Sequence, residues 1–255
     1  MRPAGHNTMI QATGPKIYSV FTTRAGGTSS TWAMGMAAAM AAKGKSVLLI
    51  DADMEGGTVM ASLGLGQYRD RSLHNIMNTS MPADALMAQT VAVPGYPTFR
   101  IIPGYRGGHY GPELNVTLGQ MEAGLKGLPD DYVFIDCGHP LSHAGIKSPQ
   151  DVLDIIGRIS SKVFVVVRDE PAFVTHALDT FHRLKIEPGG WGEMGLVVCE
   201  QRKGSARDYV RQTYARHLDM PLLPGWSWNE HQAAKCADSC KPYPMGDAPR
   251  RLDLF

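Results

Sequence analysis

The sequence has little that would place it in a membrane or on a nucleic acid by composition alone. A membrane-spanning helix needs about 20 consecutive apolar residues, and no apolar run of this chain approaches that length. The 255 residues include 25 lysines and arginines against 24 aspartates and glutamates, so the net charge is close to zero. Any binding of DNA must therefore come from a local group of basic residues.

Cysteine is also scarce, and the four positions are Cys137, Cys199, Cys236 and Cys240. The chain is too long and too apolar for a fold held together by disulfides, so a reducing, cytoplasmic setting is favoured. The last two cysteines and His231 resemble part of a metal site. A second well-spaced pair of ligands is missing there, so two incidental thiols are a better interpretation than zinc.

Short runs of β-branched and apolar residues recur along the chain, and a helical pattern follows most of them. Glycine, proline or aspartate bounds each run, which is typical of strands buried on both faces of a parallel sheet. The expected strands begin at Lys16, Ser46, Phe99, Tyr132, Lys162, Met194 and Met220. The expected helices cover Ser30–Lys43, Glu113–Lys126, Pro149–Ile159, Pro171–Leu184 and Ser205–Leu218.

This alternation predicts a three-layer α/β fold, in which a mostly parallel sheet lies between helices. A chain of this length fits one such domain with a full core. We assign residues 1–15 to a flexible leader, residues 16–245 to a single α/β domain and residues 246–255 to a C-terminal tail.

The loop between the first strand and the first helix has the glycines of a phosphate-binding loop but no lysine. From Thr22 it reads "TTRAGGTSSTW". Such loops turn backbone N–H groups toward an anion at a helix N-terminus, while a lysine neutralises the phosphates and a hydroxyl binds Mg²⁺. Taken alone, the stretch is also typical of an ordinary turn between a strand and a helix.

This loop and the segments after it resemble the MinD/ParA family of deviant phosphate-loop ATPases, whose fold is a P-loop NTPase fold. The family loop is Lys-Gly-Gly-x-Gly-Lys followed by two hydroxyl residues. Laid over it, the sequence gives, in chain order, Ala25 at the signature lysine, Gly26 and Gly27 at the paired glycines, Thr28 at the variable position, Ser29 at the third glycine and Ser30 at the second lysine.

The next residue, Thr31, falls at the hydroxyl position that binds magnesium in the family. Arg24 lies beside the first missing lysine and could substitute for it from one position away, although a guanidinium is longer and planar. The resemblance implies a site for ATP or ADP with Mg²⁺. Its loop contacts would be Arg24, Gly26, Gly27, Thr28, Ser29, Ser30 and Thr31.

Two strand ends resemble the acidic motifs of the family. "LLIDADMEGG" is similar to the first switch, and the resemblance gives Asp53 the catalytic role of orienting the attacking water, with Asp51 at the other acidic position. "YVFIDCG" is similar to the second acidic motif, which places Asp136 near the metal ion and Gly138 at the second switch. Both ends fall at the sheet edge where open α/β folds bind ligands.

The segments that bind the base in the family differ more. An asparagine usually ends the strand that here reads "GLVVCEQR", where Cys199 and Glu200 stand instead. Pro224 matches a late proline that borders the base, which makes it a candidate cofactor contact. Trp226 and Trp228 could stack on a base, although core packing is the commoner fate of tryptophan.

The missing lysines weaken the case for hydrolysis more than the case for binding. Phosphoryl transfer depends on positioning and electrostatic stabilisation, so we expect a rate lower by about 10²–10⁴. In the family, ATP closes a homodimer and the signature lysine reaches into the partner's site. Arg24, Arg106 and Lys147 are candidates for that contact, although an ordinary surface charge is the commoner role for such residues.

Arg207 and Arg211 share one face of a helix, and ParA-like proteins are similar in binding DNA without sequence preference through basic late helices. A solvated helix face is the alternative. The C-terminal "APRRLDLF" lacks the longer basic amphipathic helix by which MinD-like members attach to membranes.

Three functions follow from these observations. The leading one is a homodimeric ParA/MinD-like ATP-binding protein that partitions or positions a plasmid, a secretion or conjugation assembly or an envelope machine, with weak or absent hydrolysis. The alternatives are a pseudo-ATPase scaffold that binds a protein partner, and an adaptor that binds DNA non-specifically.

Overall fold

A computed structural model describes most of the proposed domain. It covers residues 14–53, 57–68, 70–76, 80–104, 114–140, 149–184, 193–201, 205–218, 220–223 and 225–245. The C-terminal tail and nearly all of the leader lie outside these ranges, as do Arg106, Lys147 and Pro224.

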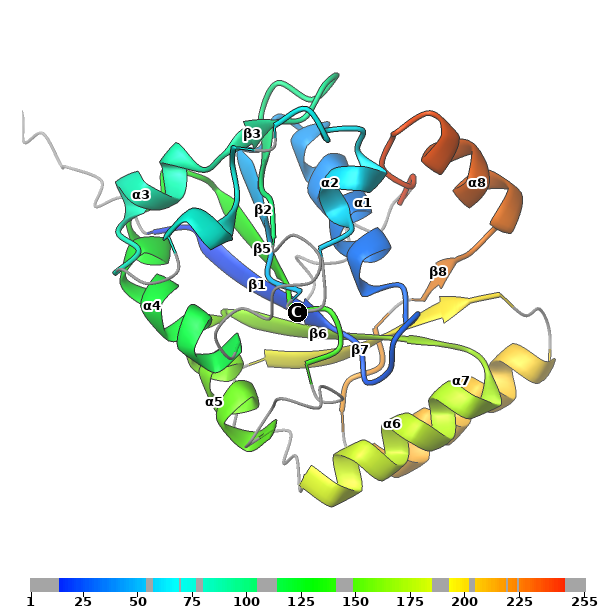
Figure 1. Ribbon diagram of the computed structural model, residues 1–255. Coiled ribbons are helices and arrows are strands. Elements are labelled where there is room, and N and C mark those ends of the chain that lie inside the picture. The colour runs from blue at the N-terminus through cyan, green and yellow to red at the C-terminus, as the bar shows by residue number, and fades with distance from the viewer. Residues whose placement is uncertain are drawn as a thin grey trace, which may run out of the picture.

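An eight-stranded sheet crosses the molecule in the order β3-β4-β2-β5-β1-β6-β7-β8 (Figure 1). Every pairing is parallel except that of β3 with β4. The strands are β1 (Lys16–Phe21), β2 (Val47–Asp51), β3 (Val91–Ala92), β4 (Phe99–Ile102), β5 (Tyr132–Asp136), β6 (Lys162–Arg168), β7 (Glu193–Glu200) and β8 (Trp226–Ser227). The mostly parallel sheet predicted from the sequence is confirmed.

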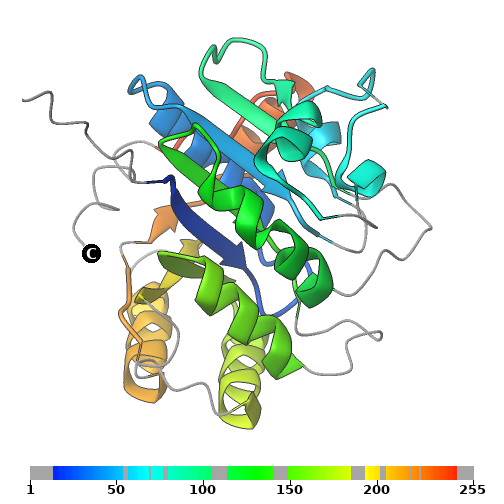
Figure 2. The ribbon, with the colours of Figure 1, turned by 90° about the vertical axis from the view of Figure 1, so that its left-hand side faces the viewer.

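Helices cover both faces of this sheet, so the three-layer prediction is also confirmed (Figure 2). They are α1 (Ser29–Ala41), α2 (Val59–Ser62), η1 (Leu73–Ile76), α3 (Ala83–Ala88), α4 (Leu114–Lys126), α5 (Pro149–Ile159), α6 (Pro171–Leu184), α7 (Ser205–His217) and α8 (Glu230–Asp238). The five helices expected from the sequence are α1, α4, α5, α6 and α7, each within two residues at either end.

The strand expected from Met220 is wrong. Only one bridge forms there, between Leu196 and Leu222, and the edge strand β8 begins later, at Trp226. Proline has no N–H to donate to a ladder, and Pro221 interrupts the expected strand. This edge of the sheet therefore ends in short pairings.

Alternate residues of each strand feed two separate cores. Ile17 and Phe21 of β1 belong to the core beneath α4, α5, α6 and α7. Tyr18 and Val20 belong to the other, which contains the buried side chains of α1. Successive side chains of a strand point to opposite faces, so the strand sequence itself divides the two layers.

The C-terminal segment packs closely against α1, and this contact needs a glycine. A Cβ atom at Gly35 would lie 2.6 Å from the carbonyl oxygen of Tyr243 and 2.5 Å from Cε of Met245. Tyr243 stacks on Trp228, with ring centroids 5.3 Å apart and planes 10° apart, and meets Trp226 edge-on. The tryptophan pair thus packs against the chain's own tyrosine.

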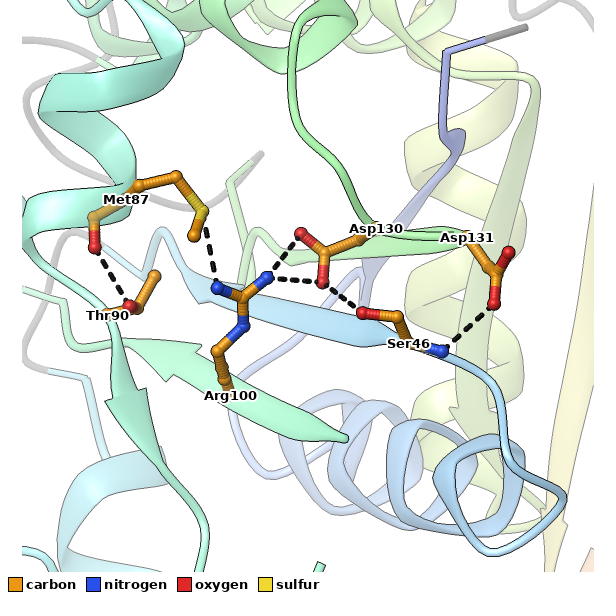
Figure 3. Close-up of polar contacts among 6 residues, drawn as sticks. All are labelled: Ser46, Met87, Thr90, Arg100, Asp130 and Asp131. Carbon is orange, nitrogen blue, oxygen red and sulfur yellow. Dashed lines mark hydrogen bonds and ion pairs between the residues drawn. The ribbon is translucent and has the colours of Figure 1, made fainter. Parts of the chain in front are cut away.

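An ion pair with a buried carboxylate lies at the amino-terminal ends of the strands, where β2 and β5 begin (Figure 3). Nη2 of Arg100 on β4 lies 2.7 Å and 2.9 Å from the two carboxylate oxygens of Asp130. The Ser46 hydroxyl donates to the same carboxylate, and the Ser46 amide donates to Asp131. These contacts tie β4, β2 and β5 together at their shared amino-terminal side.

Replacing Asp130 with alanine should lower the free energy of unfolding by about 3 kcal/mol, because its side chain is fully buried and the Arg100 charge would lose its partner. Urea unfolding followed by circular dichroism measures the change. Lys126→Gln is the matched control: it breaks an exposed pair with Glu122, and such pairs contribute about 0–1 kcal/mol. Equal effects of the two variants would contradict the role of the clamp.

Candidate functional site

The glycine-rich loop between β1 and α1 adopts a tight turn that requires both of its glycines. Gly26 has a φ of 78°, in the region that favours glycine. A Cβ atom at Gly27 would lie 1.8 Å from Oγ1 of Thr22, at the end of β1. The loop therefore folds back on the strand end, as the sequence predicted for a phosphate-binding turn.

Thr28 is the residue before helix α1, and it also has a left-handed conformation, with a φ of 68°. Its hydroxyl donates a hydrogen bond to the carbonyl of Gly27. Such a φ is uncommon for a β-branched residue. The residue before α1 therefore has a backbone conformation that glycine adopts more readily.

Three aspartates meet at the carboxyl ends of β2 and β5. Asp51 and Asp136 stand directly opposite each other in the parallel register of these strands. Oδ1 of Asp51 accepts a hydrogen bond from the amide of Asp53, at 3.3 Å. A Cβ atom at Gly138 would lie 2.5 Å from Cγ of Asp53, so this carboxylate sits against the segment after β5. The expected convergence of the two acidic motifs is present.

Burial and mutual repulsion hold a proton on these carboxyl groups more tightly than usual. Burial raises the pKa of Asp51 well above its ordinary range, and the charges of Asp136 and Asp53 raise it further. Burial also raises the pKa of Asp136 to about 6, against hydrogen bonds from Ser30, Gly138 and Ser29 that lower it. The site thus brings together acidic groups whose charges oppose one another.

The Asp136 carboxyl has one satisfied and one unsatisfied oxygen. Oδ1 accepts a hydrogen bond from the amide of Gly138, at 3.1 Å. Oδ2 is buried and has no hydrogen-bond partner among the residues that the structure describes. The hydroxyls of Ser30 and Ser29 are the loop side chains that lower the pKa of this carboxyl group. The magnesium role expected for Thr31 stays a prediction, and the contact of the Ser30 hydroxyl with Asp136 makes Ser30 a second candidate.

A magnesium ion fits this donor set. Mg²⁺ prefers hard oxygen ligands and usually keeps several waters, so one or two protein ligands and the phosphates suffice. A buried carboxylate oxygen without a partner, beside a serine hydroxyl, offers that chemistry. In the described parts of the chain, no group of three or more His, Cys, Asp or Glu side chains could hold a metal by itself.

The neighbouring strand ends, of β6 and β7, bring further side chains to the loop. Arg168 pairs in register with Cys199. Burial raises the pKa of the Cys199 thiol to about 12, while the Thr28 hydroxyl and the Arg168 charge oppose that rise. Arg168 was missed in the sequence, although "VVVRDEP" places an arginine at a strand end on the same edge as Asp51 and Asp136.

Other candidates from the sequence find structural partners instead. Trp226 is buried in the core with Tyr243, as is commoner for tryptophan. Arg211 pairs with Glu200, which ties this candidate DNA contact to the end of β7. The side chain of Arg207 lies outside the described residues. No helix in the described ranges is long and apolar enough to cross a membrane.

No protein-family model and no curated protein matches this sequence. Solved structures of the ParA and MinD ATPases do match the fold. A ParA family ATPase from Chlorobium tepidum TLS is 15% identical with a TM-score of 0.70, over 94% of this chain and 96% of that one. The septum site-determining protein MinD from Pyrococcus horikoshii OT3, complexed with Mg-ADP, is 16% identical with a TM-score of 0.65, over 93% of both chains.

A protein of Borrelia burgdorferi B31 assigned to plasmid partition, bound to AMPPNP, is 17% identical with a TM-score of 0.65. That match covers 94% of this chain and 96% of the other. The chain therefore has the P-loop NTPase fold of the ParA and MinD ATPases, and the resemblance stated from the sequence is confirmed at the level of the fold.

The raised pKa of Asp136 predicts a pH-dependent stability. The folded protein holds this proton more tightly than the unfolded chain, so the group favours folding below about pH 4, and this contribution is lost as the pH rises through about 6. Asp136→Asn stays neutral. In the absence of metal and nucleotide, it should be more stable than wild type near pH 8, by on the order of 3 kcal/mol, and similar near pH 4.

Urea unfolding of the variant and the wild type at several pH values measures this difference. Asp154→Asn, which changes an exposed carboxyl on α5, is the control. A stability difference for Asp136→Asn that does not grow between pH 4 and pH 8 would show that Asp136 is ionised at little cost in the folded protein.

Proposed function

We propose that this protein is a divergent ParA/MinD-like nucleotide-binding protein that binds ATP or ADP with Mg²⁺ and acts in the cytoplasm as a homodimer. Its role would be to partition or position a plasmid, a secretion or conjugation assembly, or an envelope assembly. The solved structures support the general role, since they include a MinD bound to Mg-ADP and a partition protein bound to AMPPNP.

The observation that carries the proposal is the Asp136 carboxyl group: its Oδ2 is buried and has no hydrogen-bond partner among the described residues, and the Ser29 and Ser30 hydroxyls at the start of α1 lower the pKa of the same group. Leaving a buried acceptor unsatisfied costs free energy, and a structural aspartate at this strand end would be expected to find a partner. An ion bound there would supply one. The turn at Gly26 and Gly27 lies at the same edge of the sheet, because a Cβ atom at Gly27 would meet Thr22, whose amide donates a hydrogen bond to Gly138 after β5. Glycine turns before a helix are a common place for anions to bind.

Each residue then has a distinct part. The loop from Arg24 to Thr28 would hold the phosphates, with the N-terminus of α1 contributing its positive end. Ser30 and Asp136 would hold Mg²⁺, with Thr31 as the alternative hydroxyl. A bound metal ion neutralises charge that develops on the phosphates. Asp53, which lies against Gly138, would orient the attacking water.

Hydrolysis is proposed to be weak or absent. The loop from Thr22 to Thr31 contains no lysine, and the charge on the transferred phosphoryl group would lack the contact on which such enzymes rely. Binding suffers less, because backbone N–H groups and the metal ion remain. A slow or idle site would suit a protein that responds to nucleotide by changing its assembly.

A pseudo-ATPase scaffold is the second candidate, and one observation favours it. Asp51 and Asp136 are paired in register at adjacent strand ends, and burial raises the pKa of each, so these carboxyl groups hold protons more tightly than usual where an active site would hold a metal ion. A scaffold would keep this arrangement permanently. The DNA-adaptor alternative has less support, since Arg211 is already paired with Glu200.

Calorimetric titration with ATP and with ADP, with and without Mg²⁺, tests the proposal when light scattering is measured on the same samples. We expect magnesium-dependent binding in the micromolar range and a shift from monomer to dimer. Asp136→Ala should abolish the magnesium dependence, because it removes the metal's carboxylate. Asp154→Ala, on the exposed side of α5, should bind as the wild type does.

Unchanged affinity in Asp136→Ala would contradict the site assignment. No heat and no change in mass for the wild type would favour the scaffold instead. An affinity for duplex DNA that falls steeply with salt would favour the adaptor.

A further inference from the structure

Two arginines share one aromatic ring beside the phosphate-binding loop. Cζ of Arg24, in the loop, lies 5.5 Å from the ring centroid of Phe173. Cζ of Arg168, at the end of β6, lies 5.7 Å from the same centroid. Phe173 is in the first turn of α6 and is buried, so it offers a fixed platform. Arginine on an aromatic face is stabilised by cation–π attraction.

This arrangement brings together positive charges that the sequence keeps far apart. Both guanidinium groups lie close to one ring centroid, at 5.5 Å and 5.7 Å, so an anion bound beside this ring would be attracted by two positive charges. The charge of Arg168 lowers the pKa of the Cys199 thiol, and a hydrogen bond from the Thr28 hydroxyl lowers the same pKa. The guanidinium of Arg168 therefore lies near the same end of the loop that precedes α1.

Arg168 has donor capacity that its visible contacts do not use. Its Nη2 lies 2.7 Å from Oε1 of Glu170, whereas its Nε is buried and has no hydrogen-bond partner within the described ranges. The pair with Glu170 is partly exposed on both sides, and such pairs contribute little to stability. A phosphate, with more charge and more acceptor oxygens, could take the place of Glu170.

We propose that Arg168, held with Arg24 against Phe173, supplies to a polyphosphate chain the positive charge that the loop lysines would otherwise provide. The ligand class is a di- or triphosphate, either as part of a nucleotide or free. The inference rests on the proposed nucleotide function and adds a residue from β6, outside the loop itself. Arginine suits this task, since its planar fork can bind two phosphate oxygens at once.

The test is calorimetric titration with ATP and, separately, with inorganic tripolyphosphate, both in excess Mg²⁺. Arg168→Gln should weaken binding of both ligands by about tenfold or more, the usual effect of losing a charge-assisted hydrogen bond. Phe173→Leu should weaken both by a smaller factor. Arg158→Gln, which changes an exposed arginine on α5 that pairs with Glu122, should bind as the wild type does.

Glu170→Gln gives a second test that does not depend on a loss. Removing the carboxylate that competes for Arg168 should tighten binding of both ligands by a few-fold. Thermal melts of every variant, followed by circular dichroism, show that the fold is kept. A gain of affinity cannot come from misfolding, so this variant tests the idea even if Arg168→Gln is unstable.

The outcomes separate the two proposals. If the wild type binds ATP while Arg168→Gln and Glu170→Gln bind it equally well, the role of Arg168 is wrong and the nucleotide function stands. If the wild type binds tripolyphosphate but not ATP, and Arg168→Gln loses that binding, the anion site stands and the nucleotide function is wrong. If the wild type binds neither ligand, both proposals fall.

Discussion

The candidate site depends on the placement of two carboxyl groups at adjacent strand ends. Parallel pairing of β2 with β5 sets Asp51 directly beside Asp136, and the helices above remove both from water. Burying charged groups is costly unless they are paired, so such groups keep their protons or bind a cation. The loop beside them has the glycines of a phosphate-binding loop but no lysine, so the proposed site would have to obtain positive charge from elsewhere.

Three sources of that charge meet at this edge of the sheet. The N-terminus of α1 contributes a partial charge through its free N–H groups, a metal ion would contribute two charges at Asp136, and arginines contribute from the loop and from β6. Arg24 and Arg168 reach the same ring of Phe173 from segments far apart in the sequence. A site assembled in this way can hold phosphates firmly while lacking the contacts that speed their transfer.

Much of this arrangement could be predicted from the sequence, and the limits are physical. The buried strand runs and the order of the strand ends placed Asp51, Asp136 and the glycine loop on one edge, and the structure agrees. The backbone conformation of the loop could not be predicted, because Thr28 has a left-handed φ that is uncommon for a β-branched residue. The amino-acid sequence alone does not determine the φ and ψ angles of such a loop.

Contacts between distant segments were harder still to foresee. Arg168 lies more than a hundred residues from the loop, and only the pairing of β1 with β6 brings them together. Trp226 and Trp228 were read as candidates for base stacking, whereas Tyr243 stacks on Trp228 and meets Trp226 edge-on after the chain returns across α1. The sequence does show an arginine at the end of the β6 strand. That arginine can be assigned to the loop after β1 only when the order of the strands is known.

Hydrogen–deuterium exchange with mass spectrometry tests the central claim most directly, that the lysine-free loop is the place where nucleotide binds. Exchange would be measured with Mg²⁺ alone, with ATP alone and with both. The account predicts slower exchange with both, in peptides that cover Thr22–Thr31 and the end of β5 at Asp136, and little change with either alone. Unaltered exchange in these peptides at saturating Mg²⁺ and ATP, or protection only elsewhere in the chain, would contradict it.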